Sequence, residues 1–346
     1  MAERRTKANL KIAFLNMRGR YHDSMDKWYH INQMMHDEKI TILALQETHL
    51  DYDQAAGINE VFVDTLHVIA SIDLDHCTSK GVALTFNKRI LGIQDLSHHE
   101  IIPGRALLVS SPWYQQEKIN ILNIYAPNDP SKNVALWEEI HDKILNLPQP
   151  DIILGDFNFV KDPLDRLPAH FDNQNTVETW RALKSHLCLT DGWRSTFPKS
   201  LSYTFAQSAH QGGHQSRIDR IYVHEDMSPH CKDWDISPSP IPTDHQMISV
   251  RISKQNMPFI GKGRWTLNPS LLHDNVKSGS TLVGGPVKSR RRRTKEESRG
   301  LDKRLVWPEL VTAWIQRLRA MSVDPLHRFW SRGEDRDRDG DGQEQE

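Results

Sequence analysis

The stretch DIILGDFNFV, residues Asp151–Val160, decides the fold. Its residues Ile152–Leu154 suit a buried strand, because β-branched and large apolar side chains favour a covered, pleated surface. The strand runs straight into GDFN, so that Asp156 and Asn158 follow a core strand with one residue between them. A buried strand needs neither a carboxylate nor an amide at its end, and we therefore expect a polar site where this strand stops.

The same pattern recurs along the chain. Polar residues stand at or beside several short apolar runs. Asn16 follows KIAFL, Glu47 follows ITILALQ, and Tyr125 is the last residue of KINILNIY. Asp219 lies inside RIDRIYV, and Asp244 and His245 directly precede QMISVRI. These residue types bind metals, phosphates and protons. The repetition indicates that several strand ends meet at one polar site.

Short apolar runs alternate with amphipathic stretches up to about residue 255. Strands are predicted over 11–16, 40–46, 67–72, 81–87, 105–110, 118–125, 151–155, 217–223 and 246–252, from their β-branched and aromatic content. Helical spacing of apolar residues predicts helices over Asp26–Asp37, Asn133–Leu145 and Thr176–His186. Many strands with helices in several of the gaps predict a sheet-based α/β domain with helices on the outside.

The composition changes after about residue 255. Residues 256–346 are rich in Gly and in charged residues, and they end in RGEDRDRDGDGQEQE. Such a segment buries too little apolar surface to offset its ordering entropy. We therefore expect a folded domain over 1–255 and a linker with a largely disordered charged tail over 256–346, interrupted by a short helix in RLVWPELVTAWIQRLRAM.

The bulk composition excludes some classes of protein and leaves others open. The formal net charge of −1 shows no global basic field, although a local basic patch for nucleic acid remains open. Three scattered cysteines disfavour a disulfide framework and a zinc site, and no run of 18 apolar residues or secretory signal is present. We expect an intracellular protein located in the nucleus, and RRRR at 290–293 is either a nuclear address or a charged patch in the tail.

Carboxylates and amides without thiolates make a hard oxygen environment, which favours Mg²⁺ or Mn²⁺ over zinc. Glu47 is a suitable ligand for such an ion, which stabilises charge on a phosphoryl oxygen and helps water attack phosphorus. An adjacent Asp-His pair, Asp244 and His245, predicts a general base or electrostatic partner whose tautomer is set by the carboxylate. Asparagine side chains can donate to a phosphate oxygen and hold a nucleophile in line.

The ordered set LNMRG, QET, IYAPN, GDFN, SRID and DH resembles the endonuclease/exonuclease/phosphatase superfamily, which is also called deoxyribonuclease-I-like. The resemblance covers about residues 10–252, and it implies a four-layer sandwich of two packed, mostly antiparallel sheets flanked by helices. Among its members, the chain looks most similar to the apurinic-type endonuclease domains of non-LTR (LINE) retrotransposons of the fungal kind. No polymerase-like YxDD follows, so we expect an element truncated before its reverse transcriptase.

The resemblance implies a role for each polar strand end. It implies a metal site made of Glu47, Asn16 and Asp244. It also implies a catalytic set in which Asp156 positions or deprotonates water, Asn158 orients the phosphate, Tyr125 contacts the phosphate or leaving group, Asp219 hydrogen-bonds near the base, and His245 faces the scissile phosphate. Each has a structural alternative, such as an Asx turn at GDFN, a surface ion pair at SRID or a cap at Asp244.

Two residues are expected to contact DNA. Arg18 departs from the family, in which apurinic endonucleases tend to carry an acid at this position, and this weakens the case for a second metal and adds a phosphate contact instead. Thr204, in LSYTF, resembles a threonine carried towards DNA on a strand, and an ordinary sheet position is the alternative.

The resemblance predicts a Mg²⁺- or Mn²⁺-dependent phosphodiesterase that nicks DNA by in-line attack of water. We expect a monomer without a membrane or an obligate protein partner. Two alternatives stay open: a phosphatase or phospholipid phosphodiesterase on the same scaffold, and a nucleic-acid-binding remnant that does not cleave.

Overall fold

A computed structural model describes residues 9–19, 24–76, 80–113, 117–208, 210 and 212–253. The predicted boundary at residue 255, the linker and tail over 256–346, the short helix and the basic run at 290–293 lie outside the described residues. None of the described helices is long and apolar enough to cross a membrane.

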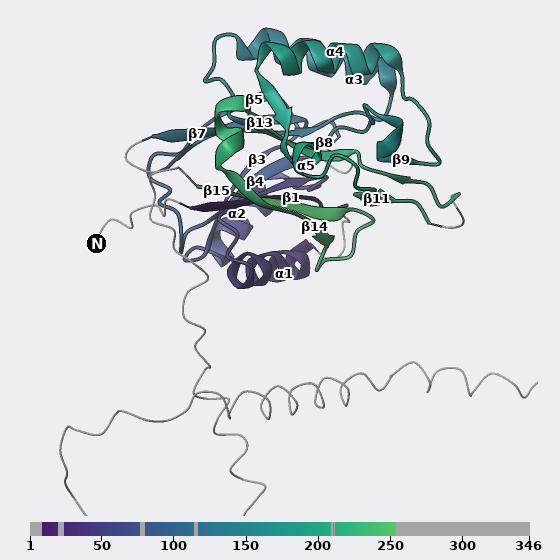
Figure 1. Cartoon of the computed structure of the whole chain (residues 1–346). Coiled ribbons are helices and arrows are strands. Elements are labelled where there is room, and N and C mark those ends of the chain that lie inside the picture. Colours follow the sequence, from purple (N-terminus) through teal and green to yellow (C-terminus); the bar gives the residue numbers. More distant parts are fainter. Residues whose placement is uncertain are drawn as a thin grey trace, which may run out of the picture. The chain divides into compact units, whose positions relative to one another are not determined.

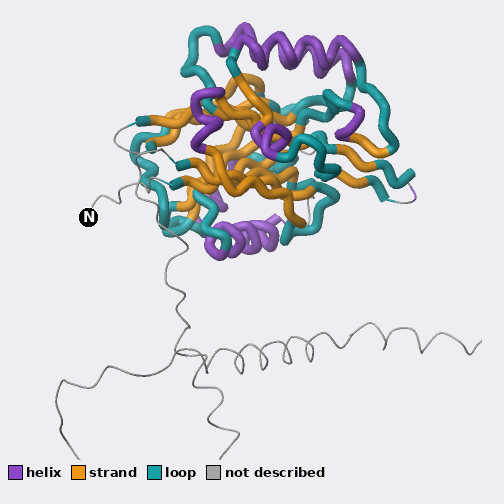
Figure 2. The backbone as a smooth tube through the Cα atoms, in the orientation of Figure 1, coloured by secondary structure: helices purple, strands orange, loops and turns teal. Residues whose placement is uncertain are grey.

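Two six-stranded sheets form the centre of the protein (Figures 1 and 2). The order in the first sheet is β14 (Cys231–Pro238), β15 (Gln246–Ile252), β1 (Leu10–Asn16), β2 (Ile42–Gln46), β4 (Val82–Asn87) and β3 (Leu66–Ser71). The order in the second is β10 (Leu189–Asp191), β13 (Asp219–His224), β8 (Ile152–Asp156), β7 (Lys118–Tyr125), β6 (Ala106–Pro112) and β5 (Ser97–Ile102). Each sheet has one parallel contact, β1 with β2 and β7 with β8, and its other contacts are antiparallel.

Helices cover the outer face of each sheet, which gives four layers. The helices α1 (Ser24–Asp37) and α2 (Tyr52–Val61) share a buried apolar cluster with the first sheet, and α3 (Pro130–Ile144) and α4 (Gln174–His186) share one with the second. A third cluster fills the space between the sheets, with side chains such as Phe14 and Ile121. Figure 1 shows α3 and α4 above the sheets and α1 below them. The predicted four-layer fold is confirmed.

Smaller elements connect these layers. A three-stranded sheet, in the order β11 (Phe205–Ala206), β12 (Gln215–Ser216) and β9 (Arg166–Leu167), lies at one end of the sandwich (Figure 1). Short helices are α5 (Gly192–Thr196), η2 (Pro163–Asp165) and η4 (Glu225–His230).

All the predicted strands and the three helices predicted before residue 255 are present, with ends that differ by a few residues, and several elements were missed. The helix α2 has only Ile58 fully buried, so its sequence carries no apolar stripe, and it begins instead with a capping box at Asp51. The strands β5 and β14 are edge strands with mostly exposed or half-buried side chains, and apolar patterning does not identify such strands.

One polar bridge crosses the apolar space between the sheets. Asn123 of β7 is fully buried, and its side chain donates to the backbone carbonyls of Leu45 and Ala83 in the first sheet, at 3.1 and 2.9 Å. The Gln46 side chain donates back to Asn123 at 2.6 Å. A buried polar group is costly unless it is hydrogen-bonded, so this bridge favours one alignment of the two sheets over others.

Candidate active site

The strand registers bring the polar strand ends to one edge of the sandwich. Asn16 is paired with Gln46 across the parallel strands β1 and β2, and Tyr125 is paired with Asp156 across β7 and β8. Asp219, the first residue of the antiparallel strand β13, is also paired with Asp156. The parallel strands β7 and β8 end on the same side of the sheet, and the antiparallel strand β13 begins there. Tyr125, Asp156 and Asp219 therefore meet at this edge.

Asn16 joins the two sheets at this edge. Its amide nitrogen donates to the carboxylates of Glu47 at 2.8 Å and Asp156 at 3.0 Å. Glu47 itself adopts a left-handed backbone conformation, with φ of 48°, directly after β2. A non-glycine residue rarely takes this conformation, and such local strain is concentrated at functional sites.

Asp156 and Asn158 form an Asx turn that also presents both side chains to the site. The Asn158 backbone nitrogen donates to Asp156 at 3.0 Å, and the Asn158 amide donates to the carbonyl of Ala126 at 2.7 Å. Asp156 is buried, and burial, followed by the negative charge of Asp219, raises the pKa of Asp156 to about 7. The turn and the functional interpretation are therefore compatible, because the turn holds in place a carboxylate that can accept a proton near neutral pH.

Asp219 and His245 form a buried pair. The Nδ1 atom of His245 lies 2.8 Å from Asp219 Oδ2, and both residues are almost fully buried. Burial disfavours the charged imidazolium, but the negative charge and hydrogen bond of Asp219, with the charges of Asp156 and Asp244, outweigh burial and raise the pKa of His245 to about 9. The histidine is therefore held in its protonated form at neutral pH, with Nε2 left to donate.

Tyr125 lies between the acids and an arginine that the sequence did not reveal. Burial and the charges of Glu47 and Asp156 raise the pKa of Tyr125, so the phenol keeps its proton. The guanidinium of Arg105 lies 4.5 Å from the centre of the Tyr125 ring and donates to the Tyr125 carbonyl at 3.1 Å. Arg105 directly precedes β6 without any motif around it, and no sequence signal marks it as part of the site.

One predicted pairing is wrong. The carboxylate that orients His245 belongs to Asp219 and not to its neighbour Asp244, because successive side chains near a strand point to opposite sides. Asp244 instead forms an ion pair with Arg18, with the nitrogen and oxygen atoms 2.7 Å apart. Glu47 and Asn16 are in contact as expected, but the third member of their predicted metal set, Asp244, already has a cationic partner.

Thr204 takes the structural position that was the alternative to a DNA contact. It is fully buried, and its hydroxyl accepts a hydrogen bond from the backbone of Asp219 at 3.1 Å. Its backbone also pairs with Ser216 at 2.9 Å and accepts from Gln246 at 2.7 Å. The threonine therefore supports the segment that carries Asp219, and this placement does not support a direct contact with DNA.

The donors at this edge suit a hard divalent cation. Asp156, Asp219 and His245 each offer a ligand atom within 4.8 Å of the others, and Asp219 Oδ1 accepts no hydrogen bond from the described residues. The close contact of His245 Nδ1 with Asp219 leaves that nitrogen to a proton. Oxygen atoms of Glu47, Asp156 and Asp219, together with the amide of Asn16, are therefore the better candidates for Mg²⁺ or Mn²⁺.

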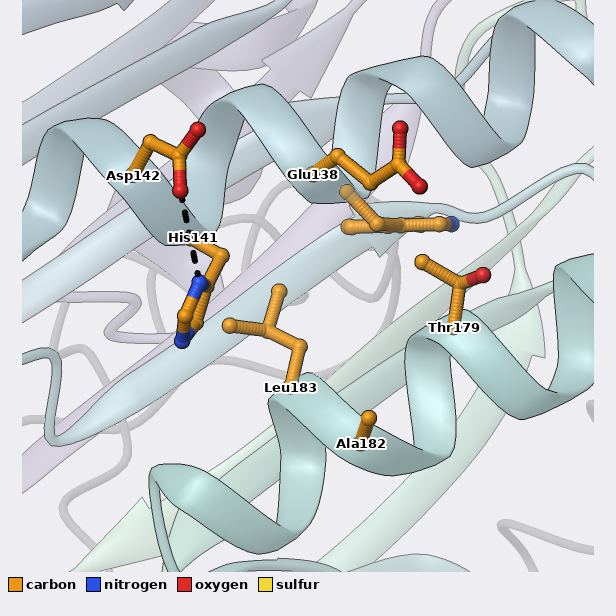
Figure 3. A pocket seen from close by; sticks show the side chains of 7 residues that line it. Glu138, His141, Asp142, Thr179, Ala182 and Leu183 are labelled. Carbon is orange, nitrogen blue, oxygen red and sulfur yellow. Dashed lines mark ion pairs between the residues drawn. The ribbon is translucent and has the colours of Figure 1, made fainter.

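A separate hollow lies between α3 and α4 in the outer helical layer (Figure 3). It measures about 420 Å³ and is lined by Trp137, Glu138, His141, Asp142, Thr179, Ala182 and Leu183. None of the strand-end residues lines it, so the hollow is not part of the candidate active site.

One edge of the sandwich therefore combines buried carboxylates, a protonated histidine and oxygen ligands for a cation. Hydrolysis of a phosphoester requires groups of these kinds. The profile of the Endonuclease/Exonuclease/phosphatase family matches residues 13–245, and the chain belongs to this family. The family comprises nucleases and phosphodiesterases, and the match includes every strand end described above.

Related proteins agree with this assignment. The transposon TX1 uncharacterized 149 kDa protein of Xenopus laevis is 30% identical over 236 residues, which is 66% of this chain and 17% of that protein. The AP endonuclease LMAP of Leishmania major has a similar structure, with a TM-score of 0.60 and 16% identity over 71% of this chain and 88% of the other. The endonuclease domain of TRAS1, a telomere-specific non-LTR retrotransposon, has a TM-score of 0.52 and 16% identity over 71% and 99% of the two chains. The chain therefore spans a small part of the transposon protein and nearly all of the TRAS1 domain.

Proposed function

We propose that this protein is a divalent-metal-dependent endonuclease that nicks DNA by in-line attack of water on phosphorus. The observation that carries the proposal is the convergence of Asn16, Asp156, Asp219 and His245 at one edge, with Asn16 bonded to Asp156 at 3.0 Å, Asp219 bonded to His245 at 2.8 Å, and ligand atoms of Asp156, Asp219 and His245 within 4.8 Å of one another. The surroundings of these groups also raise the pKa of Asp156 to about 7 and that of His245 to about 9. A pair of neighbouring groups whose environments set different protonation states defines an acid and a base. The similarity to a transposon protein and to DNA-processing nucleases supports DNA as the substrate.

Asp156 is the group that accepts the proton of the attacking water. Its carboxylate is held by Asn16 and by the Asn158 backbone, so it has a defined orientation. The pKa near 7 matches a proton acceptor that works at neutral pH. Asn158 lies beside it and has one amide hydrogen left to orient a phosphate oxygen, because the other is bonded to Ala126.

His245 is the group that faces the developing negative charge. Its protonated ring, held by Asp219, can donate from Nε2 to a phosphate oxygen. Tyr125 keeps its phenolic proton and can donate to the same phosphate or to the leaving oxygen. Of the candidate oxygen ligands, Glu47, Asn16 and Asp219 would hold the divalent cation, because Asp156 is assigned to accept the proton of water. The cation, when bound, supplies positive charge at a phosphoryl oxygen.

A plasmid-nicking assay tests the proposal. Supercoiled plasmid with Mg²⁺ should be converted to the open circular form, and the reaction should stop with EDTA. Glu47→Ala and His245→Ala should each lower the rate by about 100-fold or more, since each removes a charged group that acts in the transition state. A matched change far from the site, His98→Ala, should leave the rate unchanged.

The same series of variants distinguishes the competing functions. Inositol phosphate and sphingomyelin, offered in place of plasmid, test the phosphatase and phospholipid phosphodiesterase alternatives. Cleavage of these substrates without nicking of DNA would contradict the proposal. DNA binding by the wild type without any nicking would identify a protein that binds DNA without cleaving it.

A further inference from the structure

The short strand β11 lies directly beside the segment that carries His245. Phe205 of β11 and His245 form an isolated antiparallel β-bridge. The backbone nitrogens of Gln246 and Ala206 donate across this bridge, at 2.7 and 3.3 Å, so the bonds flank the pair of residues instead of joining it. An antiparallel pair of this kind holds its two side chains closest together and on the same face.

The bridge places the phenyl ring of Phe205 against the imidazole of His245. The centres of the two rings lie 4.9 Å apart, and the ring planes are inclined by 45°. His245 is only 7% exposed, whereas Phe205 is half-buried, so the phenyl ring lies on the outer side of the imidazole. An aromatic ring within about 6 Å of a cation also attracts it, which suits an imidazolium.

The hydrogen bond with Asp219 does not by itself fix the plane of the imidazole. Nδ1 of His245 lies 2.8 Å from Asp219 Oδ2, which sets the position of that nitrogen. The ring can still turn about this bond, because the second side-chain torsion of histidine has broad minima. A contact on the face of the ring limits this rotation, since a turned imidazole would collide with Phe205. The direction of Nε2 therefore depends on Phe205.

The residue before Phe205 connects the same segment to Asp219. The hydroxyl of Thr204 accepts a hydrogen bond from the backbone of Asp219 at 3.1 Å, and the Thr204 backbone nitrogen donates to Ser216 at 2.9 Å. One short segment, 204–206, therefore contacts both members of the Asp219–His245 pair, through the hydroxyl on one side and the phenyl ring on the other.

We propose that Phe205 is a positioning residue for His245, which acts on the chemical step and not on the binding of DNA. Its ring keeps the imidazole in the plane in which Nε2 faces the scissile phosphate, and it limits the access of water to the hydrogen bond with Asp219. The effect on the reaction rate rests on the proposed function, whereas the contact of the two rings and the shielding of the hydrogen bond do not.

The kinetics of plasmid nicking distinguish positioning from DNA binding. In the full-length protein, Phe205→Leu should lower kcat by about tenfold, because a misoriented group loses much of its contribution, while KM stays within about twofold. Phe205→Tyr, which keeps the aromatic ring, should recover most of the lost kcat. Phe197→Leu is the matched control, because Phe197 packs against another ring, that of Trp193 at 5.4 Å, and this change should leave both constants unaltered.

Nuclear magnetic resonance tests the geometry without an activity measurement. In the full-length protein without metal, the ring protons of Phe205 and His245 should show nuclear Overhauser contacts. The proton on His245 Nδ1 should exchange with water faster in Phe205→Leu than in the wild type, because its shield is smaller, and Phe197→Leu should not change this exchange. Thermal unfolding shows that each variant is folded, and Phe205→Met takes the place of Phe205→Leu if the leucine variant does not fold.

The outcomes separate the inference from the proposed function. A raised KM with an unchanged kcat in Phe205→Leu would identify a DNA contact and overturn the inference. Equal losses of kcat in Phe205→Tyr and Phe205→Leu would overturn it too, as would equal exchange of the His245 proton in the wild type and Phe205→Leu. The expected exchange rates in a wild type that does not nick DNA would overturn the function and leave the contact of the two rings standing.

Discussion

Two acidic residues of the site, Asp156 and Asp219, lie buried side by side, and their mutual repulsion lowers the stability of the metal-free fold. Asp156 is buried beside Asp219, and these surroundings raise its pKa to about 7. In an unfolded chain the carboxyl group has a pKa near 3.9. A folded-state pKa above the unfolded value means that the associated stability is present below about pH 4 and is lost as the pH rises through 7.

Replacing Asp156 should therefore stabilise the metal-free protein while abolishing activity. In EDTA, the melting temperature of the wild type should fall between pH 4 and 7 relative to that of Asp156→Asn. The variant should melt several degrees higher above pH 7, since the shift corresponds to a few kcal/mol. The exposed change Asp64→Asn is the control. If the melting temperatures of the wild type and Asp156→Asn changed with pH in the same way, burial of the charged Asp156 carboxylate would not destabilise the fold.

Asp219 is the largest of the influences that favour the protonated form of His245, ahead of Asp156 and Asp244. Asp219→Asn should therefore lower the pKa of His245 from about 9, because burial, which disfavours the imidazolium, is then opposed only by the two more distant carboxylates. The stability that the ion pair contributes is present below pH 6.5 and is lost as the pH rises through 9.

Nuclear magnetic resonance of the imidazole ring measures this change directly. The His245 resonance should titrate near pH 9 in the wild type and at a lower pH in Asp219→Asn, while exposed His98 serves as a reference in the same spectra. The nicking rate of the variant should also decline at a lower pH than that of the wild type, because its histidine becomes neutral earlier. An unchanged His245 titration would contradict the assigned pair.

At the scale of elements, the tight packing of β8 against β7 positions Asp156. Gly155 has a φ of 140°, and a Cβ atom there would lie 2.0 Å from the carbonyl oxygen of Ile124. Gly155→Ala should therefore destabilise the protein by about 3 kcal/mol or more, or prevent folding, because backbone atoms cannot move aside as a side chain can.

A second glycine is the matched control. Gly57 lies in α2, and a Cβ atom added there would meet no neighbouring atom within 4 Å. Gly57→Ala should stabilise the protein by about 0.5 to 1 kcal/mol, since alanine favours helix. Urea unfolding of both variants gives the comparison. Equal effects of the two changes would contradict the argument from close packing.

A buried ion-pair cluster connects the small sheet region to β13. Arg217, 1% exposed, lies 2.8 Å from Asp165 and 2.8 Å from Asp191, and Arg194 also pairs with Asp165. Arg217→Met should cost about 3 to 5 kcal/mol, because it leaves two buried carboxylates without their main partner. Arg251→Met, which breaks an exposed pair, should cost less than about 1 kcal/mol in the same urea unfolding measurement.

The sequence predicted elements well where burial is strong and poorly where it is weak. The strand that ends in Asp156 has both faces covered, so its apolar run is unambiguous. The edge strand β5 contains two histidines and a glutamate, and nothing in its composition distinguishes it from a loop. The site residues show the same contrast. Glu47 and Asp156 were predicted because they stand at the ends of buried strands. The role of Arg105 and the pairing of His245 with Asp219 could not be predicted, because they depend on which separate segments come close together in the fold.

At the scale of the whole molecule, the site depends on the alignment of the two sheets. Asn16 and Glu47 come from the first sheet, and Tyr125, Asp156 and Asp219 come from the second. The contact of Asn16 with Asp156, at 3.0 Å, spans the boundary between them. A small shift of one sheet along the other would therefore separate the acids from the amide that orients them.

The Asn123–Gln46 bridge allows this dependence to be measured. Asn123→Leu alone leaves the buried side-chain amide of Gln46 without its acceptor and should cost about 1 to 3 kcal/mol. Adding Gln46→Leu should recover most of the stability, since apolar groups replace both partners. The double variant should still nick DNA more slowly at saturating substrate. Full activity in the stable double variant would contradict a role for the bridge in aligning the site.

The two sheets repeat one order of pairing, antiparallel, parallel and antiparallel, in β15-β1-β2-β4 and in β13-β8-β7-β6. The repeat makes the active site a set of matched couples, in which equivalent positions of the two sheets face and bond to each other: Asn16 with Asp156, Glu47 with Tyr125, and His245 with Asp219. In each couple one member is an acid and the other is not. The order of strand pairing is thus nearly twofold, and the asymmetry of the site comes from its side chains, because Asp156 and Asp219 lie in the second sheet whereas Glu47 follows a strand of the first.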